Sequence, residues 1–219
     1  MEDSLVDNRY LTKTFLWMFL GLVGTAIVAA YVYYSGLWMN LAINNGYMIA
    51  AIIELIAVLV FSFLFRKLSP TAAGILFFVY SFINGITFSL IFAVYDLNSI
   101  IIAFASTAVL YGGLAFIGLK TNKDITNWRT ILMIALIVGI VASLINLFLQ
   151  NEMIDILITW GMLILFCAFT IYDMKKLKDL SQDPSIDQEK VYIYCAMQLY
   201  LDFINIFIRL LRIFASKRN

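Results

Sequence analysis

The sequence predicts an all-helical integral membrane protein, a bundle of seven transmembrane helices that form a single domain over residues 1–219. Hydrophobic residues make up 63% of the chain and charged residues only 13%, whereas a soluble domain is about half apolar and about a quarter charged. The apolar residues also gather in seven long runs, and lysine and arginine gather in alternate connections between them. A water-soluble chain of this composition would lack a polar surface.

Each apolar run is long enough to cross a membrane as a helix. A hydrocarbon core about 30 Å thick needs about 20 apolar residues, because every backbone polar group must be bonded within the segment. The runs are 14–34, 46–65, 71–95, 99–119, 130–149, 153–172 and 191–214. The first is too long for a removable signal peptide and lacks a small-residue cleavage site, so we expect it to be retained. The connections 96–98 and 150–152 are so short that neighbouring helices must run antiparallel.

Lysine and arginine indicate the orientation, because short loops that carry them stay in the cytoplasm. Eleven lie in the N-terminal tail and after the second, fourth and sixth runs, namely Arg9, Lys13, Arg66, Lys67, Lys120, Lys123, Arg129, Lys175, Lys176, Lys178 and Lys190. The other connections contain none, which predicts a cytoplasmic N-terminus. The basic C-terminal end fits less well. Either the earlier loops dominate and the last run crosses fully, which we favour, or the last run is re-entrant.

Composition argues against several classes of function. The net charge of +1 provides no basic surface, so we expect no nucleic-acid partner. The chain has no histidine, the commonest metal ligand and the usual side chain that titrates near neutrality. Cys167 and Cys195 lie in apolar runs, where free cysteine behaves as a small hydrophobic residue. Spacings typical of zinc sites, phosphate-binding loops and nucleophile pairs are absent, so we expect neither an enzyme nor a cofactor.

Three carboxylates occur at or near membrane depth, where an ionised acid is costly. Glu54 lies in the middle of the second run and is either an ion-pathway carboxylate or a hydrogen-bonded contact between helices. Asp173 closes the sixth run beside lysines, where an acid is ordinary by itself. Asp202 lies deep in the last run, with an apolar stretch on each side. Solvation at a helix end therefore does not account for Asp202.

The two aspartates are expected to lie at similar depths. At about 1.5 Å per residue, Asp202 lies roughly 16 Å along a helix that begins near Val191, which reaches the level of Asp173 if that helix starts in the cytoplasm. Paired carboxylates cannot both ionise cheaply at close range, so they share a proton. Such a pair would let a protein without histidine respond to pH. Arg66 closes the second run and is either a counter-charge for this pair or an ordinary cytoplasmic anchor.

Three stretches carry a resemblance to a known family. The most specific is 199–212 around Asp202, and residues 84–88 in the third run and 171–173 at the end of the sixth agree with it in order and spacing. In these stretches, and over essentially its whole length, the chain resembles the Bax inhibitor-1 family, also called the transmembrane Bax inhibitor motif family, and its bacterial members in particular.

The resemblance implies six helices around a central C-terminal helix, and a calcium leak that responds to pH. The aspartates matching Asp173 and Asp202 form the family's pH-sensing pair, a possible Ca²⁺ site, and an arginine at the end of the second helix latches to it. Arg66 or Lys67 would supply that latch, with Arg66 the better match. Protonation would weaken the latch, whereas the deprotonated pair would attract Ca²⁺, the transported ion. Glu54 is then a candidate for the ion pathway.

Two other functions stay open. Some bacterial relatives bind other membrane proteins, including a quality-control protease, so the chain is alternatively a regulatory partner of membrane proteins. A proton-coupled cation exchanger would use the same carboxylates, although no internal repeat favours it. We expect a monomer or a weak homo-oligomer in a bacterial plasma membrane, because the sequence has no organelle-retrieval signal.

Overall fold

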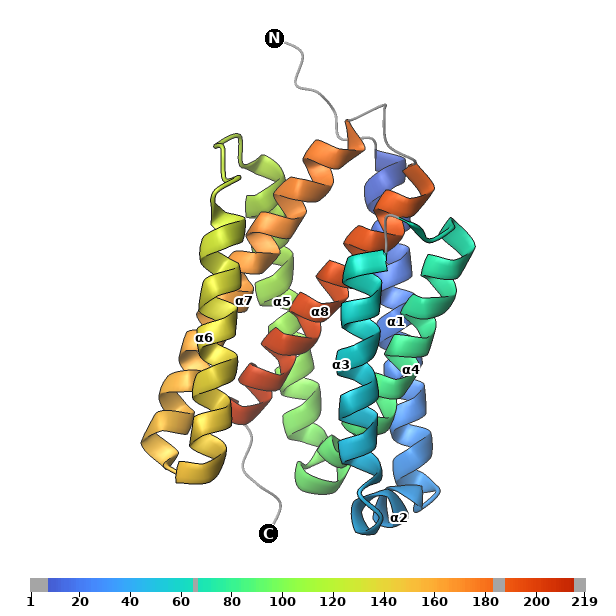
Figure 1. Cartoon of the computed structure of the whole chain (residues 1–219), viewed down its shortest axis with the longest axis vertical. Helices are drawn as coiled ribbons and strands as arrows, with labels where there is room; N and C mark the ends of the chain where they lie inside the picture. Colours follow the sequence, from blue (N-terminus) through green and yellow to red (C-terminus); the bar gives the residue numbers. More distant parts are fainter. Residues whose placement is uncertain (1–7, 65–66, 183–187, 215–219) are drawn as a thin grey trace.

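The elements of this protein are all α-helices in the computed structural model, which describes residues 8–64, 67–182 and 188–214 (Figure 1). They are α1 (Asn8–Tyr34), α2 (Leu37–Ile43), α3 (Gly46–Leu64), α4 (Pro70–Val94), α5 (Leu97–Lys120), α6 (Trp128–Leu149), α7 (Glu152–Ser181) and α8 (Gln188–Phe214). The prediction of an all-helical protein is therefore confirmed.

Six of the described helices, α1 and α4 to α8, are long and apolar enough to cross a membrane. A seventh span results if α2 and α3 are counted together, although an 87° bend separates them. The bend lies at Asn45, whose φ of 55° is left-handed, a conformation that asparagine tolerates better than most residues. The connection expected at 35–45 thus contains a short helix of its own.

Polar residues in the short connections act as helix caps. The Asp96 carboxylate accepts a hydrogen bond from the Ser99 backbone N–H at 3.0 Å, and Asn151 Oδ1 accepts one from the Ile154 N–H at 3.1 Å. Each satisfies a backbone donor that the first helical turn leaves free. The Ser99 hydrogen bonds also lower the pKa of Asp96. These caps let the chain reverse within a few residues.

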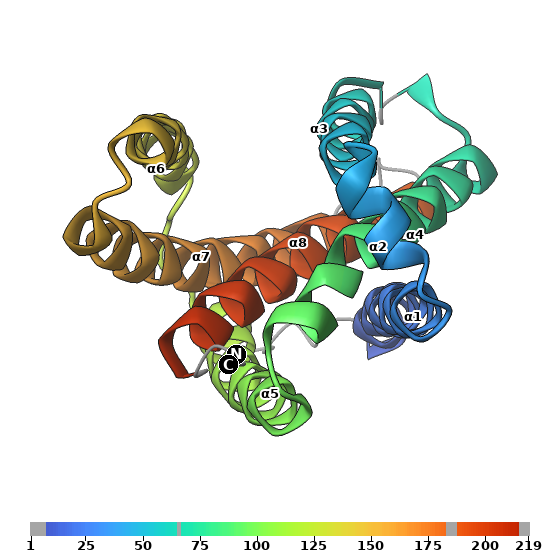
Figure 2. The same ribbon diagram turned by 90° about the horizontal axis from the view of Figure 1, so that it is seen from below.

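Helix α8 is the most buried of the candidate spans. Its most apolar window is 67% buried within the protein, against 39% or less for the other five. It packs against α1, α4, α5 and α7, while α3 and α6 stand apart from each other on the opposite side (Figure 2). The helix is unbroken from 188 to 214. Its last turn lies toward the end of the bundle that is opposite to the start of α1 (Figure 1). This course agrees with a full crossing.

A buried hydroxyl chain fastens α8 to α1 and α4. The Thr25 and Tyr200 hydroxyl oxygens lie 2.7 Å apart, and Thr25 Oγ1 is 2.9 Å from the Ser81 carbonyl oxygen. A carbonyl only accepts, so Thr25 donates to it and Tyr200 donates to Thr25. A Cβ on Gly85 would lie 2.7 Å from the Thr25 carbonyl oxygen, so glycine is what permits the close approach of α1 and α4.

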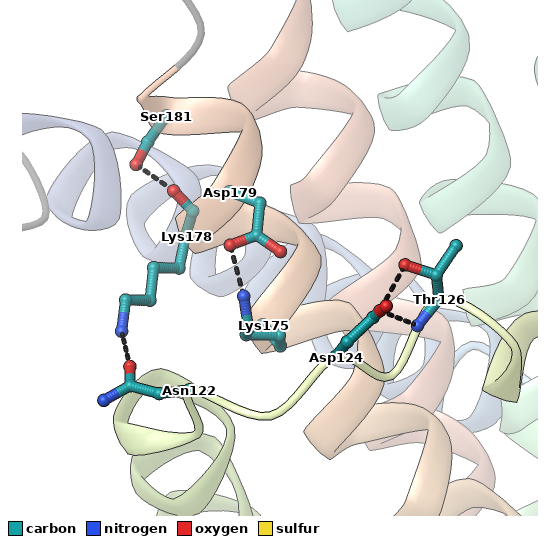
Figure 3. Close-up of polar contacts among 7 residues, drawn as sticks. All are labelled: Asn122, Asp124, Thr126, Lys175, Lys178, Asp179 and Ser181. Carbon is teal, nitrogen blue, oxygen red and sulfur yellow. Dashed lines mark hydrogen bonds and ion pairs between the residues drawn. The ribbon is translucent and has the colours of Figure 1, made fainter.

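Helix α7 is longer than predicted. The expected span ends at 172, but the helix continues to Ser181. Figure 3 shows the contacts at this end: Lys175 pairs with Asp179, and Lys178 Nζ donates to Asn122 Oδ1 of the α5–α6 connection at 3.0 Å. Pairs four residues apart stabilise a helix outside the membrane. Two further turns of helix therefore follow Asp173.

Candidate functional site

A cavity of about 580 Å³ lies between α3, α6, α7 and α8. Val58 contributes from α3, and apolar side chains of α6 and α7 form much of the wall. Its polar lining consists of Ser143, Asp173, Gln198, Asp202, Asn205 and Arg209. Asp173 and Asp202 come from different helices, α7 and α8, so both aspartates singled out in the sequence line one cavity.

The two aspartates are deeply buried. Asp173 is 6% exposed and Asp202 is 4% exposed, and the Asp173 charge acts electrostatically on Asp202. The Oδ2 atom of Asp202 is buried and has no hydrogen-bond partner among the described residues. A buried carboxylate oxygen without a donor is costly. The cavity offers space for a water molecule that donates a hydrogen bond to this oxygen, or for a cation that binds it.

Basic and aromatic groups surround Asp173 on the side of the basic loops. The charges of Lys176 and Arg129 act on its carboxylate. Lys176 Nζ lies 3.1 Å from the Tyr194 hydroxyl and 4.6 Å from the centre of its ring. Phe61 of α3 stacks on Tyr194 with ring centres 6.3 Å apart. Contacts thus link Lys176, whose charge acts on Asp173, to Phe61 of α3 through Tyr194.

Sequence reasoning missed this cluster because the sixth span was ended at 172. Once α7 continues, Asp173 and Lys176 stand three residues apart, a spacing that places them on one helix face. Phe61 and Tyr194 carried no such signal, because they are far apart in the sequence and meet only through the stacking of their rings.

Of the two candidates for the latch, only Lys67 belongs to the part of the chain that the structure describes. Arg66 lies outside the described residues, so its role stays a prediction. Lys67 is exposed at the start of the connection to α4. Among the described residues, the basic groups found to act on Asp173 are Lys176 and Arg129 instead.

Glu54 has a different environment. The Thr87 hydroxyl of α4 donates to Glu54 Oε1 at 2.5 Å, and two turns earlier the Tyr47 hydroxyl lies 2.8 Å from Ser89 Oγ. Both contacts hold α3 against α4. Glu54 does not line the cavity of Asp173 and Asp202, although Val58, one turn later, does. Of the three acids, the structure brings two together and places the third at a helix contact.

Two carboxylates alone would supply few of the ligands that a bound Ca²⁺ takes. No group of three or more His, Cys, Asp and Glu that could hold a metal occurs within the described parts of the chain. Ca²⁺ takes six to eight oxygen ligands, so two carboxylates would leave most positions to water or to the amides of Gln198 and Asn205 in the same cavity. An ion that passes through a site must also be able to leave it.

Comparisons with known proteins agree with the motifs. A family model described as inhibitor of apoptosis-promoting Bax1 matches residues 7–219. The chain is 36% identical to the inner membrane protein YbhL of Escherichia coli strain K12, over 99% of this chain and 97% of YbhL. It is 36% identical to an uncharacterized membrane protein of Streptococcus pyogenes serotype M1, over 94% and 92% of the two chains. An uncharacterized protein of Borreliella burgdorferi is 30% identical over 100% and 96%.

These matches span nearly the whole chain and its relatives, and two of the relatives are named as membrane proteins. With the apolar helices, they confirm the predicted multi-pass bacterial membrane protein. The chain belongs to the Bax inhibitor-1 family.

Proposed function

We propose that this protein is a calcium leak channel of the bacterial cell membrane, and that Asp173 and Asp202 form its pH sensor. One observation carries the proposal: two buried carboxylates from different helices line one cavity, and an oxygen of Asp202 has no hydrogen-bond partner among the described residues. Two buried acids in one cavity either share a proton or, when both are ionised, need a cation to offset their charges. The same pair would therefore bind protons and calcium in competition.

The proposed gate is helix α3. Apart from its contacts with α4, it reaches α8 through Phe61, which rests on Tyr194, and most of its middle is exposed to the surroundings. The break at Asn45 provides a hinge at its far end. Arg66 follows α3 in the sequence, and we propose that it latches to the aspartates when they are ionised. Protonation would release it and let α3 move.

Helix α8 is the proposed central helix of the bundle, with the other six spans arranged around it. Its high burial supports this role. Glu54 is a candidate for the ion pathway, although its hydrogen bond to Thr87 equally suits a contact that holds α3 to α4. The energetic cost of leaving this hydrogen bond broken would oppose a large movement of α3.

The test is calcium flux into liposomes. Purified protein is reconstituted with a calcium-sensitive dye inside, and flux is recorded between about pH 6 and about pH 8, a range that a titratable sensor would cover. We expect a pH-dependent flux in the wild type that Asp202→Asn and Asp173→Asn flatten. Glu189→Gln is the control, because Glu189 lies at the start of α8, outside the cavity.

Flux that is no greater than in empty liposomes at every pH would overturn the channel proposal. Flux with an unchanged pH dependence in both variants would keep the leak but reject the aspartate pair as its sensor.

A further inference from the structure

Two helices carry polar stripes that run toward the end of the bundle opposite the basic loops, which we call the outer end. On α8 the stripe is Asp202, Asn205, Arg209 and Arg212. On α6 it is Ser143 and Asn146, and Gln150 follows as the residue that caps the end of the helix. Steps of three and four residues keep each stripe on one helix face. Polar residues at this depth are costly unless they meet each other or water.

The two stripes face a common space. A cavity of about 800 Å³ is lined by Ser143, Asn146 and Gln150, by the last two residues of the α8 stripe, Arg209 and Arg212, and by Glu152 and Asp155 at the start of α7. Ser143, Leu147 and Arg209 line this cavity and also the cavity of Asp173 and Asp202. The two spaces therefore adjoin, and Arg209 is at their junction. We call the outer space, lined by the α6 and α8 stripes, the vestibule.

Four charged residues line the vestibule, namely Arg209, Arg212, Glu152 and Asp155. Arg212 is paired with Asp155, with Nη1 and Oδ1 3.2 Å apart. The same two residues act electrostatically on Arg209 in opposite directions, Arg212 more strongly than Asp155. The Nε atom of Arg209 is buried and has no hydrogen-bond partner among the described residues. The ion pairs among the described residues do not include Arg209, which lies seven residues from Asp202 on the same face of α8.

We propose that the vestibule is a water-filled entrance from the outer side to the aspartate cavity, and that Arg209 is its specificity-determining residue. A fixed positive charge at the junction raises the local concentration of small anions and repels cations that approach Asp202 from this side. For calcium the inference rests on the proposed leak: Arg209 then holds the leak slow. The vestibule itself does not depend on that function.

The test uses cysteine accessibility in proteoliposomes. Cys167 and Cys195 are replaced by alanine, and single cysteines are placed by Ser143→Cys, Asn146→Cys and Ile145→Cys. Ile145 adjoins Asn146 but is 53% exposed on the outside of the bundle and lines neither cavity. Two water-soluble methanethiosulfonate reagents of similar size are compared, one cationic and one anionic.

We expect the cysteines at 143 and 146 to react, and the one at 145 to stay unreactive because lipid covers it. The anionic reagent should react faster at 143 than the cationic one. Arg209→Gln should lower that ratio several-fold, and Arg209→Lys, which keeps the charge, should restore it. In the flux assay, Arg209→Gln should raise calcium flux several-fold without changing its pH dependence.

Three results would overturn parts of this inference. Unreactive cysteines at 143 and 146 would reject a water-filled vestibule. A rate ratio that Arg209→Gln leaves unchanged, in protein that elutes as a single species, would reject the electrostatic role. Reaction rates as expected with no calcium flux in any variant would retain the vestibule and reject the leak, so the two proposals fail separately.

Discussion

Glu54 and Asp202 are both acids at membrane depth, yet their surroundings differ in almost every respect. Glu54 lies on α3, at the edge of the bundle, and accepts a hydrogen bond from Thr87. Asp202 lies on the most buried span, beside Asp173, with one oxygen that lacks a donor among the described residues. A carboxylate that a neighbouring helix satisfies fastens two helices together. One that is left unsatisfied next to a second acid is free to take up a proton or a cation.

The largest expected effect is that of Asp202→Asn. The substitution removes a buried charge and keeps the shape of the side chain, so we expect flux to lose its pH dependence while the free energy of unfolding rises by about 1 to 3 kcal/mol. Flux over pH and denaturant unfolding in detergent measure the two effects. A clear loss of stability would mean that Asp202 is a structural contact like Glu54, and would contradict the proposed difference between the two acids.

A second prediction concerns the packing that positions Asp173. A Cβ at Gly118 would lie 2.7 Å from the Ile171 carbonyl oxygen, so Gly118→Ala must push α5 away from α7. We expect a loss of about 1 to 3 kcal/mol in the free energy of unfolding. Gly113→Ala is the matched control on the same helix, since nothing lies within 4 Å of its Cβ. Equal stability of the two variants would contradict the close packing of α5 on α7.

The Glu54 contact is expected to contribute less. Thr87→Val keeps the side-chain volume but leaves Glu54 without its donor, and should reduce the free energy of unfolding by about 0.5 to 2 kcal/mol. Thr87→Ser should retain most of it, because the hydroxyl remains. A double-mutant cycle with Glu54→Gln measures the coupling. Zero coupling would show that the two side chains do not interact in the membrane.

The smallest expected effect lies where the two regions meet. Tyr194→Phe removes the hydroxyl that Lys176 contacts but keeps the ring on which Phe61 stacks. We expect a change of about 0.5 to 1 kcal/mol in the free energy of unfolding. Tyr194→Leu removes the ring as well and should loosen the end of α3 further, measured by hydrogen exchange of its amides. Identical exchange in both variants would show that the Tyr194 ring does not couple α3 to the aspartate site.

Much of the fold could be predicted from the sequence. Long apolar runs, short polar connections and the distribution of lysine are local features, and each predicted run lies on a helix of the structure. The end of α7 was missed because the apolar signal stops at the membrane, whereas the helix goes on through Lys175 and Asp179 and through the contact of Lys178 with Asn122. Hydropathy cannot detect a helix that continues into water.

The sequence also does not tell which glycines lie at helix contacts. Small residues such as Gly85, Gly112, Gly113 and Gly139 are candidates for close helix approaches in a membrane. A Cβ would collide with a neighbouring helix at Gly85 and with Met162 at Gly139, but it would meet nothing within 4 Å at Gly112 or Gly113. Small residues permit close packing, but which of them are used depends on how the helices are placed.

The sequence by itself determined that the chain is a multi-pass helical membrane protein of the Bax inhibitor-1 family, and it drew attention to Glu54, Asp173 and Asp202 because acids are costly in lipid. The tertiary structure alone decided that Asp173 and Asp202 line one cavity, that Glu54 is satisfied by Thr87, and that Arg209 lies at the junction of two cavities. The physical reason is that the free-energy cost of an acid in the membrane depends on the residue and its depth. Whether that cost is offset depends on hydrogen-bond and charge partners, which only helix packing supplies.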